Sequence, residues 1–241
     1  MIYLTGHGAL AAELKNTNIK IKSLRNFGSK AYADADCIIH NAANLNPKSH
    51  EETYQDNVVP LSNLINSIDP NKRFIMISSM SVLQNKNMPK LIYKMNHYTR
   101  SKYICETLVK DTLKNYMIIR FSSLFYADPL RDGLSKMIYD AKTKKQITLI
   151  NNGEAKRDWL PLRIAAKKIL TLNTKGFKGT VNLASGNPWS FGAVAGFLKF
   201  LDDDIEIINE DAKHIEVLSD FDWNCNINLA EEIRTYYERI I

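Results

Sequence analysis

Residues 1–11 read MIYLTGHGALA, and this stretch decides the fold. Ile2 to Thr5 is short and apolar, as in a buried strand, and the residues after the glycines have the pattern of a helix. Gly6 permits a tight turn, Gly8 lets the backbone approach a pyrophosphate, and Ala11 is small enough for close packing of helix on strand. This glycine pattern also occurs in plain turns. Dinucleotide binding is favoured here because the pattern lies between a predicted strand and a predicted helix.

Strands and helices alternate along the rest of the chain. Further strands are predicted over Ile19 to Leu24, Cys37 to His40, Phe74 to Ser78, Met117 to Arg120, Ile147 to Ile150 and Thr180 to Ala184. Helices are predicted over Ala9 to Lys15, Glu52 to Ser67, Tyr98 to Lys114, residues 131–143, Pro161 to Leu172 and Leu229 to Ile240. This alternation indicates the α/β class, with a Rossmann-type doubly wound parallel sheet.

The domain boundaries follow from where the alternation loosens, after Arg120. We expect a dinucleotide-binding domain over residues 1–125 together with about 160–185. A small C-terminal substrate lobe over 126–159 and 186–241 would interleave with it.

The composition excludes several classes of protein. The formal charge is +6, but the basic residues are scattered rather than interleaved with aromatic residues, which argues against nucleic acid. No apolar run is long enough to span a membrane. The three cysteines cannot all pair and lack metal-type spacing, so we expect reduced thiols, no metal site and a cytoplasmic location.

The end of the second predicted strand bears on the choice of dinucleotide. A carboxylate there would bind the ribose hydroxyls of NAD, but the segment reads SLRN (residues 23–26). Arg25, with Lys30, could instead hold a 2′-phosphate. A surface arginine is the competing interpretation. The sequence favours NADP, with NAD as the alternative.

A catalytic pair is indicated by YTRSK (residues 98–102), which places Tyr98 and Lys102 one helical turn apart. A nearby ammonium favours the phenolate form of tyrosine and so suits Tyr98 for proton transfer. A lone Tyr-x-x-x-Lys is weak evidence, but here Ser101 and Glu106 extend it. The pair also follows a strand ending in SSMSV (residues 78–82), whose hydroxyls would lie at the ligand-binding edge of the sheet.

At this point the chain resembles the extended short-chain dehydrogenase/reductases, a family of nucleotide-sugar epimerases, dehydratases and keto-reductases. The resemblance covers nearly the whole length. It rests on IIHNAA (38–43), on the Tyr98-x-x-Ser101-Lys102-x-x-x-Glu106 string, on RDW (157–159) and on GTVNLASG (179–186). The chain departs from the family in its shorter glycine turn and in the little room before Asp36 for the usual third strand.

The resemblance implies roles for individual residues. Ser79, Tyr98 and Lys102 would be catalytic, with Ser79 bonding the reacting oxygen and Lys102 tuning Tyr98. The dinucleotide would be bound by Gly6, His7, Gly8, Ala9, Leu10, Arg25, Asn41, Ala42, Ala43, Asn57, Ser78, Tyr98 and Lys102. The substrate would be bound by Ser81, Ser123 and Arg157. Arg157 could contact a pyrophosphate or pair structurally with Asp158.

The residues after Ser79 discriminate among the family's reactions. Dehydratases of the family carry acids there, whereas this chain has Met80 and Ser81, which cannot act as acids. The resemblance therefore implies an oxidoreductase that reduces a keto group on a nucleotide-linked sugar or a related carbonyl compound. A 4-epimerase is the alternative, and a non-catalytic NADP-binding regulatory protein is a further one. The family's paired helices would also give a homodimer, here through Glu52–Ser67 and Tyr98–Lys114.

Overall fold

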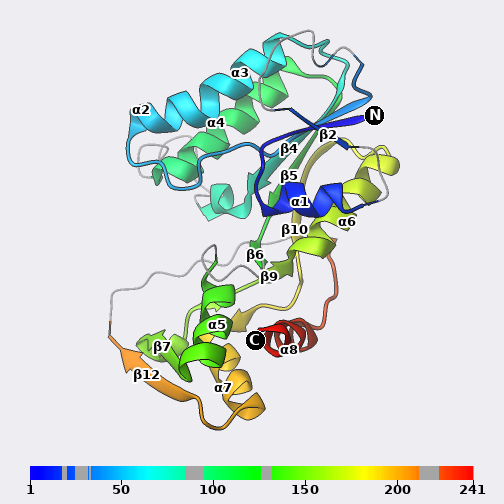
Figure 1. Cartoon of the computed structure of the whole chain (residues 1–241). Helices are drawn as coiled ribbons and strands as arrows, with labels where there is room; N and C mark the ends of the chain where they lie inside the picture. Colours follow the sequence, from blue (N-terminus) through cyan, green and yellow to red (C-terminus); the bar gives the residue numbers. More distant parts are fainter. Residues whose placement is uncertain are drawn as a thin grey trace. The chain divides into compact units, whose positions relative to one another are not determined.

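The computed structural model describes residues 1–17, 21–24, 32, 34–84, 95–125, 132–211 and 223–240 (Figure 1). The chain divides into two compact units. The first contains Met1–Phe121 and Ala165–Asn182, and the second contains Ser122–Ile164 and Leu183–Ile241. In the described ranges, no helix is both long enough and apolar enough to cross a membrane.

A seven-stranded sheet has the order β13-β10-β5-β4-β3-β1-β2. Its strands are β1 (Ile2–Thr5), β2 (Ile21–Leu24), β3 (Cys37–His40), β4 (Arg73–Ser79), β5 (Tyr116–Phe121), β10 (Gly179–Ala184) and β13 (Trp223–Asn224). The β1–β2, β1–β3, β3–β4 and β4–β5 pairs are all parallel. The chain order reverses beside β1, and ligands of doubly wound sheets bind at such a reversal, outside the carboxyl ends of the strands.

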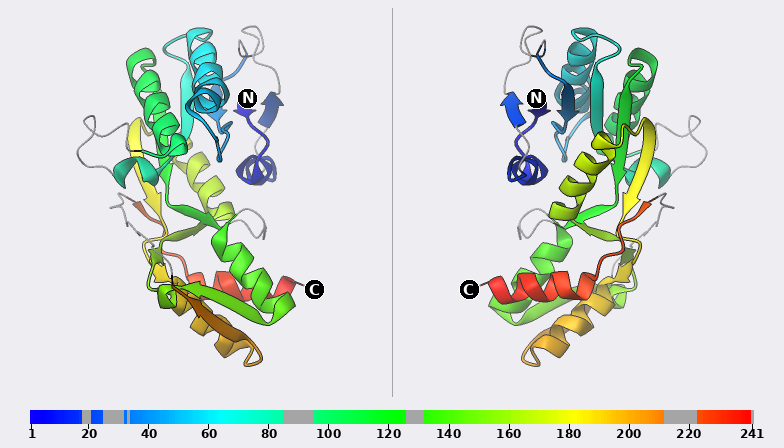
Figure 2. Two further views of the ribbon diagram at one scale, coloured as in Figure 1. Left: turned by 90° about the vertical axis from the view of Figure 1, so that its left-hand side faces the viewer. Right: turned by 90° about the vertical axis from the view of Figure 1, so that its right-hand side faces the viewer.

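Helices cover both faces of this sheet (Figures 1 and 2). On one face lie α3 (Val59–Asn66) and α4 (His97–Thr112), and on the other lie α1 (Ala9–Lys15) and α6 (Leu162–Thr174). Because side chains alternate along a strand, β4 sends Phe74 and Met76 into the core beneath α3 and α4. Burial of strands on both sides explains why they read as continuous apolar runs.

One long helical segment contains a wide turn that the sequence did not indicate. It runs from α2 (His50–Thr53) through a π turn at Tyr54–Val58 into α3. Pro60 lies at the start of α3 and has no N–H to donate to the carbonyl of Asp56, one normal turn earlier. The π turn is where the helix adjusts to this missing bond.

The second unit has its own core. It contains α5 (Gly133–Lys144), α7 (Phe191–Leu201) and α8 (Leu229–Arg239), with a parallel pair of strands, β7 (Gln146–Ile150) and β12 (Glu206–Glu210). Two short pairs join β6 (Ser123–Phe125) to β9 (Trp159–Pro161) and β8 (Lys156–Arg157) to β11 (Trp189–Ser190). The side chains of Asp132, Ser190 and Asn228 cap the three helices.

The expected α/β class and doubly wound sheet are confirmed. The observed helices and strands differ from the predicted ones mainly by one to three residues at their ends, as helix boundaries commonly do. The sequence missed α7, β12 and the short strands β6, β8, β9, β11 and β13. The homodimer stays a prediction, and the exposed residues of α4, which are Thr107, Lys110 and Asp111, are polar.

The turn at Gly6 generates a first prediction. Gly6 has φ +88°, and a Cβ there would lie 2.8 Å from the backbone nitrogen of Ala42. Gly6→Ala should therefore lower the free energy of unfolding by about 2 kcal/mol or more, through both left-handed strain and collision with backbone. Denaturant unfolding measures the loss.

Gly176→Ala is the matched control, because Gly176 has φ +67° and open space around its Cβ position. It should show only the strain, about 1 kcal/mol. Equal losses in the two variants would contradict a close approach at Gly6.

Candidate active site

The carboxyl ends of β1, β3 and β4 meet at one edge of the first unit's sheet. The glycine turn leaves β1 here and lies directly against Asn41 and Ala42, which follow β3. The backbone N–H of Asn41 donates to the carbonyl of Thr5 at 3.2 Å. The structure thus brings the predicted Gly6, Asn41 and Ala42 together. His7 is exposed beside them, whereas the side chain of Leu10 is buried, so it can offer a ligand only its backbone.

His40 ends β3 as a buried neutral residue. Its Nδ1 lies 2.9 Å from the hydroxyl of Thr5, and only 3% of the residue is exposed. Burial, with the nearby charge of Lys102, lowers the pKa of His40 to about 3. The Thr5 side chain thus provides a hydrogen-bond partner for this buried ring.

The predicted catalytic residues lie where β4 ends. Lys102 on α4 is 5% exposed, and its ammonium donates to the carbonyl oxygen of Ile77 at 2.9 Å. The same nitrogen lies 5.7 Å from the centre of the Tyr98 ring. Ser79 closes the strand, and its hydroxyl accepts a bond from the Ser81 backbone at 3.2 Å. Tyr98 and Lys102 therefore share one helix face that reaches the end of β4.

Two residues predicted to bind the dinucleotide have side chains that are hydrogen-bonded within the protein. The amide nitrogen of Asn57 donates to the Ser101 hydroxyl at 2.9 Å and to the Asn44 carbonyl at 3.0 Å. Its oxygen accepts from the Asn44 backbone at 2.6 Å. The Ser78 hydroxyl donates to Glu106 at 2.7 Å. Both side chains join α4 to neighbouring segments, and this role was not foreseen.

Other predicted residues belong to the second unit, have a buried side chain or fall outside the described part of the chain. Arg25, the residue expected to select the cofactor, falls outside the described residues, and so does Lys30. Ser123 and Arg157 belong to the second unit, in β6 and β8. The Ser81 hydroxyl is buried, with no hydrogen-bond partner in the described ranges.

Asp158, next to Arg157, has a structural role. Its carboxylate accepts bonds from the Ser185 backbone at 2.7 Å, the Ser185 hydroxyl at 2.9 Å and the Gly186 backbone at 2.9 Å. Because Asp158 is 8% exposed, these donors compensate the burial of its charge.

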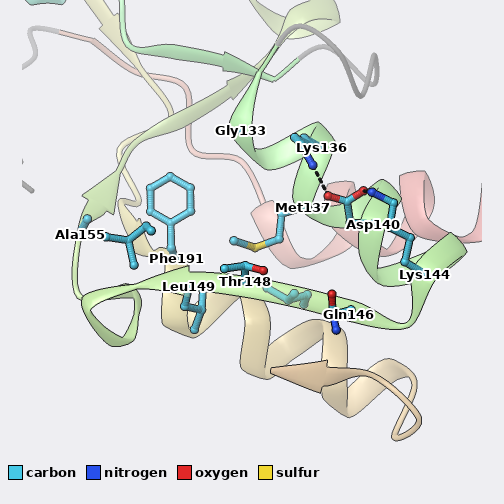
Figure 3. A pocket seen from close by; sticks show the side chains of 12 residues that line it. Gly133, Lys136, Met137, Asp140, Lys144, Gln146, Thr148, Leu149, Ala155 and Phe191 are labelled. Atoms are coloured by element: carbon cyan, nitrogen blue, oxygen red, sulfur yellow. Dashed lines mark hydrogen bonds and ion pairs between the residues drawn. The ribbon is translucent and has the colours of Figure 1, made fainter. Parts of the chain in front are cut away.

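The second unit also contains a cavity of about 520 Å³ that the sequence did not indicate. It lies between α5 and β7, with Met137 and Phe191 among its apolar side chains (Figure 3). Lys136 and Lys144 both pair with Asp140 on the α5 wall. The lining residues are Gly133, Lys136, Met137, Asp140, Lys144, Gln146, Ile147, Thr148, Leu149, Ile150, Ala155 and Phe191. The one sequence pattern that could have indicated this wall of the cavity is the alternation of polar and apolar residues at the start of β7.

Solved structures with a similar fold include enzymes that act on nucleotide sugars. The chain is similar to the NAD dependent NDP-hexosamine 5,6-dehydratase TunA of tunicamycin biosynthesis, with TM-score 0.80, 17% identity and coverage of 98% of this chain and 96% of that one. It is equally similar to UDP-N-acetylglucosamine 4-epimerase from Methanobrevibacter ruminantium M1, solved with UDP-N-acetylmuramic acid, with TM-score 0.80, 18% identity and coverage of 98% and 96%.

A third similar structure is dTDP-4-dehydrorhamnose reductase from Bacillus anthracis in complex with NADP. Its TM-score is 0.71 with 18% identity, covering 87% of this chain and 83% of that one. At these identities the likenesses show the fold. No curated protein matches the sequence.

The family is shown by the sequence itself. Residues 9–184 match the model of the NAD dependent epimerase/dehydratase family, which is most of the chain. The match contains the end of β3, Ser79 and the Tyr98–Lys102 pair, and it begins immediately after the glycine turn. This confirms the expected resemblance and the expectation of an enzyme that uses a nicotinamide dinucleotide. The chain belongs to the NAD dependent epimerase/dehydratase family.

Proposed function

We propose that the chain reduces a keto group on a nucleotide-linked sugar, with NADPH as reductant and Tyr98 as proton donor. The observation that carries this proposal is the Lys102 ammonium, which donates to a carbonyl of β4, the strand that ends at Ser79, and lies 5.7 Å from the centre of the Tyr98 ring. A protein that only bound a dinucleotide would have no need for a buried ammonium beside a tyrosine ring.

The residues of the first unit fit a dinucleotide. A Cβ at Gly6 would collide with the backbone of Ala42. Because Gly6 has no side chain, only backbone atoms of the turn face the point where the strand order of the sheet reverses. When bound there, the dinucleotide would supply a hydride to the carbonyl carbon.

The protein groups would handle the oxygen. As the C=O bond opens, Tyr98 gives its hydroxyl proton to the developing alkoxide and becomes a phenolate, which later takes a proton from solvent. The Lys102 ammonium stabilises that phenolate. The Ser79 hydroxyl, at the end of β4, would donate a hydrogen bond to the same oxygen.

The residues after Ser79 favour reduction over loss of water. Met80 is buried at 6% exposure, and Ser81 offers only a hydroxyl. Neither can remove or supply the proton that dehydration needs. A 4-epimerase remains the second candidate, because it needs only the same hydride and proton steps and one similar structure is a UDP-sugar 4-epimerase.

The cavity between α5 and β7 supports the nucleotide-sugar class. Its volume of about 520 Å³ is in the usual range for small-molecule sites, and its walls combine apolar and polar groups. We propose that it can bind a nucleotide. The Thr148 hydroxyl and Gln146 amide line it and could recognise polar edges of a base.

Removal of one hydroxyl tests the proton donor. Tyr98→Phe should lower turnover by about 100-fold or more, because general-acid catalysis is lost while the ring stays. The dissociation constant for NADPH should hardly change. Tyr103→Phe, on the same helix, is the control and should keep activity. Substantial turnover by Tyr98→Phe would refute the assignment.

Cofactor preference is testable by calorimetry. The chain should bind NADPH more tightly than NADH, because no acid ends the second strand and Arg25 follows it. Arg25→Ala should weaken NADPH binding by about tenfold or more and NADH binding little. Lys15→Ala is the exposed-charge control. Equal affinities for the two dinucleotides in the unaltered protein would remove the preference.

The reaction itself is tested with a 4-keto-6-deoxy nucleotide sugar. Adding it to enzyme and NADPH should cause a loss of NADPH absorbance equal to the sugar consumed. Inversion of a nucleotide sugar without net oxidation of NADPH would favour the epimerase instead. Release of water to give a keto-deoxy product would reject both.

A further inference from the structure

Three residues of α4 face the end of β4 at intervals of one turn. They are Tyr98, Lys102 and Glu106, and residues four apart lie on one side of a helix. Lys102 bonds the carbonyl of Ile77, and Glu106 bonds the hydroxyl of Ser78, the next residue of the strand. The helix is therefore attached to two consecutive residues of β4, immediately before Ser79.

Glu106 is a buried carboxylate with a full set of donors. It is 1% exposed. Its Oε1 accepts from Ser78 and, at 2.8 Å, from Nε of Arg120, while its Oε2 accepts from Nη2 of Arg120 at 2.5 Å. Lys110 adds a longer contact at 3.3 Å. The Arg120 fork comes from β5, so Glu106 joins one helix to two adjacent strands.

The Glu106 carboxylate keeps its negative charge in the folded protein. Burial raises the pKa of Glu106, but the hydrogen bond and charge of Arg120, with the bond from Ser78 and the charge of Lys110, outweigh it and lower the pKa below its usual value. Glu106 is therefore an anion at neutral pH. The carboxylate lies one helical turn from the buried ammonium of Lys102.

Lys102 has few other compensating charges. Burial lowers its pKa, while Cys105 and Glu106 raise it. The Cys105 thiol has its pKa raised to about 11 by burial, so it is neutral at physiological pH. His40, facing Lys102 from β3, is also neutral. The Ile77 carbonyl accepts a hydrogen bond from the ammonium but is itself a neutral group.

We propose that Glu106, oriented by Arg120 and Ser78, is a positioning residue that keeps Lys102 charged and aligned with the end of β4. Glu106 touches neither cofactor nor reacting atoms in this scheme and acts through Lys102. The inference rests on the proposed function only in giving Lys102 a chemical task.

The titration of Lys102 tests this without any substrate. Protein carrying ¹³C-labelled lysine is titrated by NMR, and the Lys102 signal is assigned by its loss in Lys102→Arg. Glu106→Gln removes the anion and leaves Arg120 uncompensated. The midpoint of the Lys102 titration should then move down by about one pH unit.

Arg120→Gln is the opposed variant. It removes the cation that offsets Glu106, so the Lys102 midpoint should move up. Lys110→Gln is the control, because Lys110 is partly exposed and its contact is long, and it should cause little change. If Glu106 and Arg120 only stabilised the fold, Glu106→Gln and Arg120→Gln would both lower the stability of the protein. The midpoint of the Lys102 titration would then not shift in opposite directions in the two variants.

These measurements distinguish failure of the Glu106 proposal from failure of the proposed reaction. Folded Glu106→Gln with an unshifted Lys102 midpoint would overturn the proposal, whatever the enzyme reduces. Should Glu106→Gln not fold, an unshifted or lowered midpoint in Arg120→Gln would overturn it equally. Opposite shifts, without reduction of any keto-sugar, would support Glu106 as the positioning residue and reject only the proposed reaction.

Discussion

The hydrogen bond from the Lys102 ammonium to the Ile77 carbonyl joins the helix that carries Tyr98 to the strand that carries Ser79. Ile77 lies near the carboxyl end of β4, and a buried backbone carbonyl is costly without a hydrogen-bond donor. A lysine is long enough to supply that donor from α4. The same bond places a cation beside the tyrosine ring, so one interaction both completes the strand end and prepares the site for chemistry.

The sequence was informative where short-range patterns and the local fold agree. The runs that became β1, β3, β4 and β5 are buried on both faces, and apolar content alone identifies such strands. Tyr98 and Lys102 were found because helical spacing puts them on one side. The family resemblance supplied Ser79, since its position at the strand end depends on where β4 stops.

The sequence was less informative where packing between segments far apart in the chain determines the local structure. α7 contains Gly192 and Gly196, which lower helix propensity, and its helical form depends on Val194 and Leu198 entering the second unit's core. The cavity between α5 and β7 arises from packing of segments that no local pattern relates. Asn57 looked like a ligand-binding residue, but its hydrogen bonds to Asn44 and Ser101 are visible only in three dimensions.

The π turn before Pro60 has a consequence for the length of this segment. A π turn holds one residue more than an α turn, and each residue of an α-helix turns the next by about 100°. Removal of a single residue between 54 and 58 would close the wide turn into an α turn and leave the direction in which α3 presents its residues unchanged. Leu61, Leu64 and Ile65 would then stay in the core. The wide turn thus holds one residue that the helix can lose, and a one-residue deletion here should be tolerated better than the same deletion inside α3, which would rotate every residue after it.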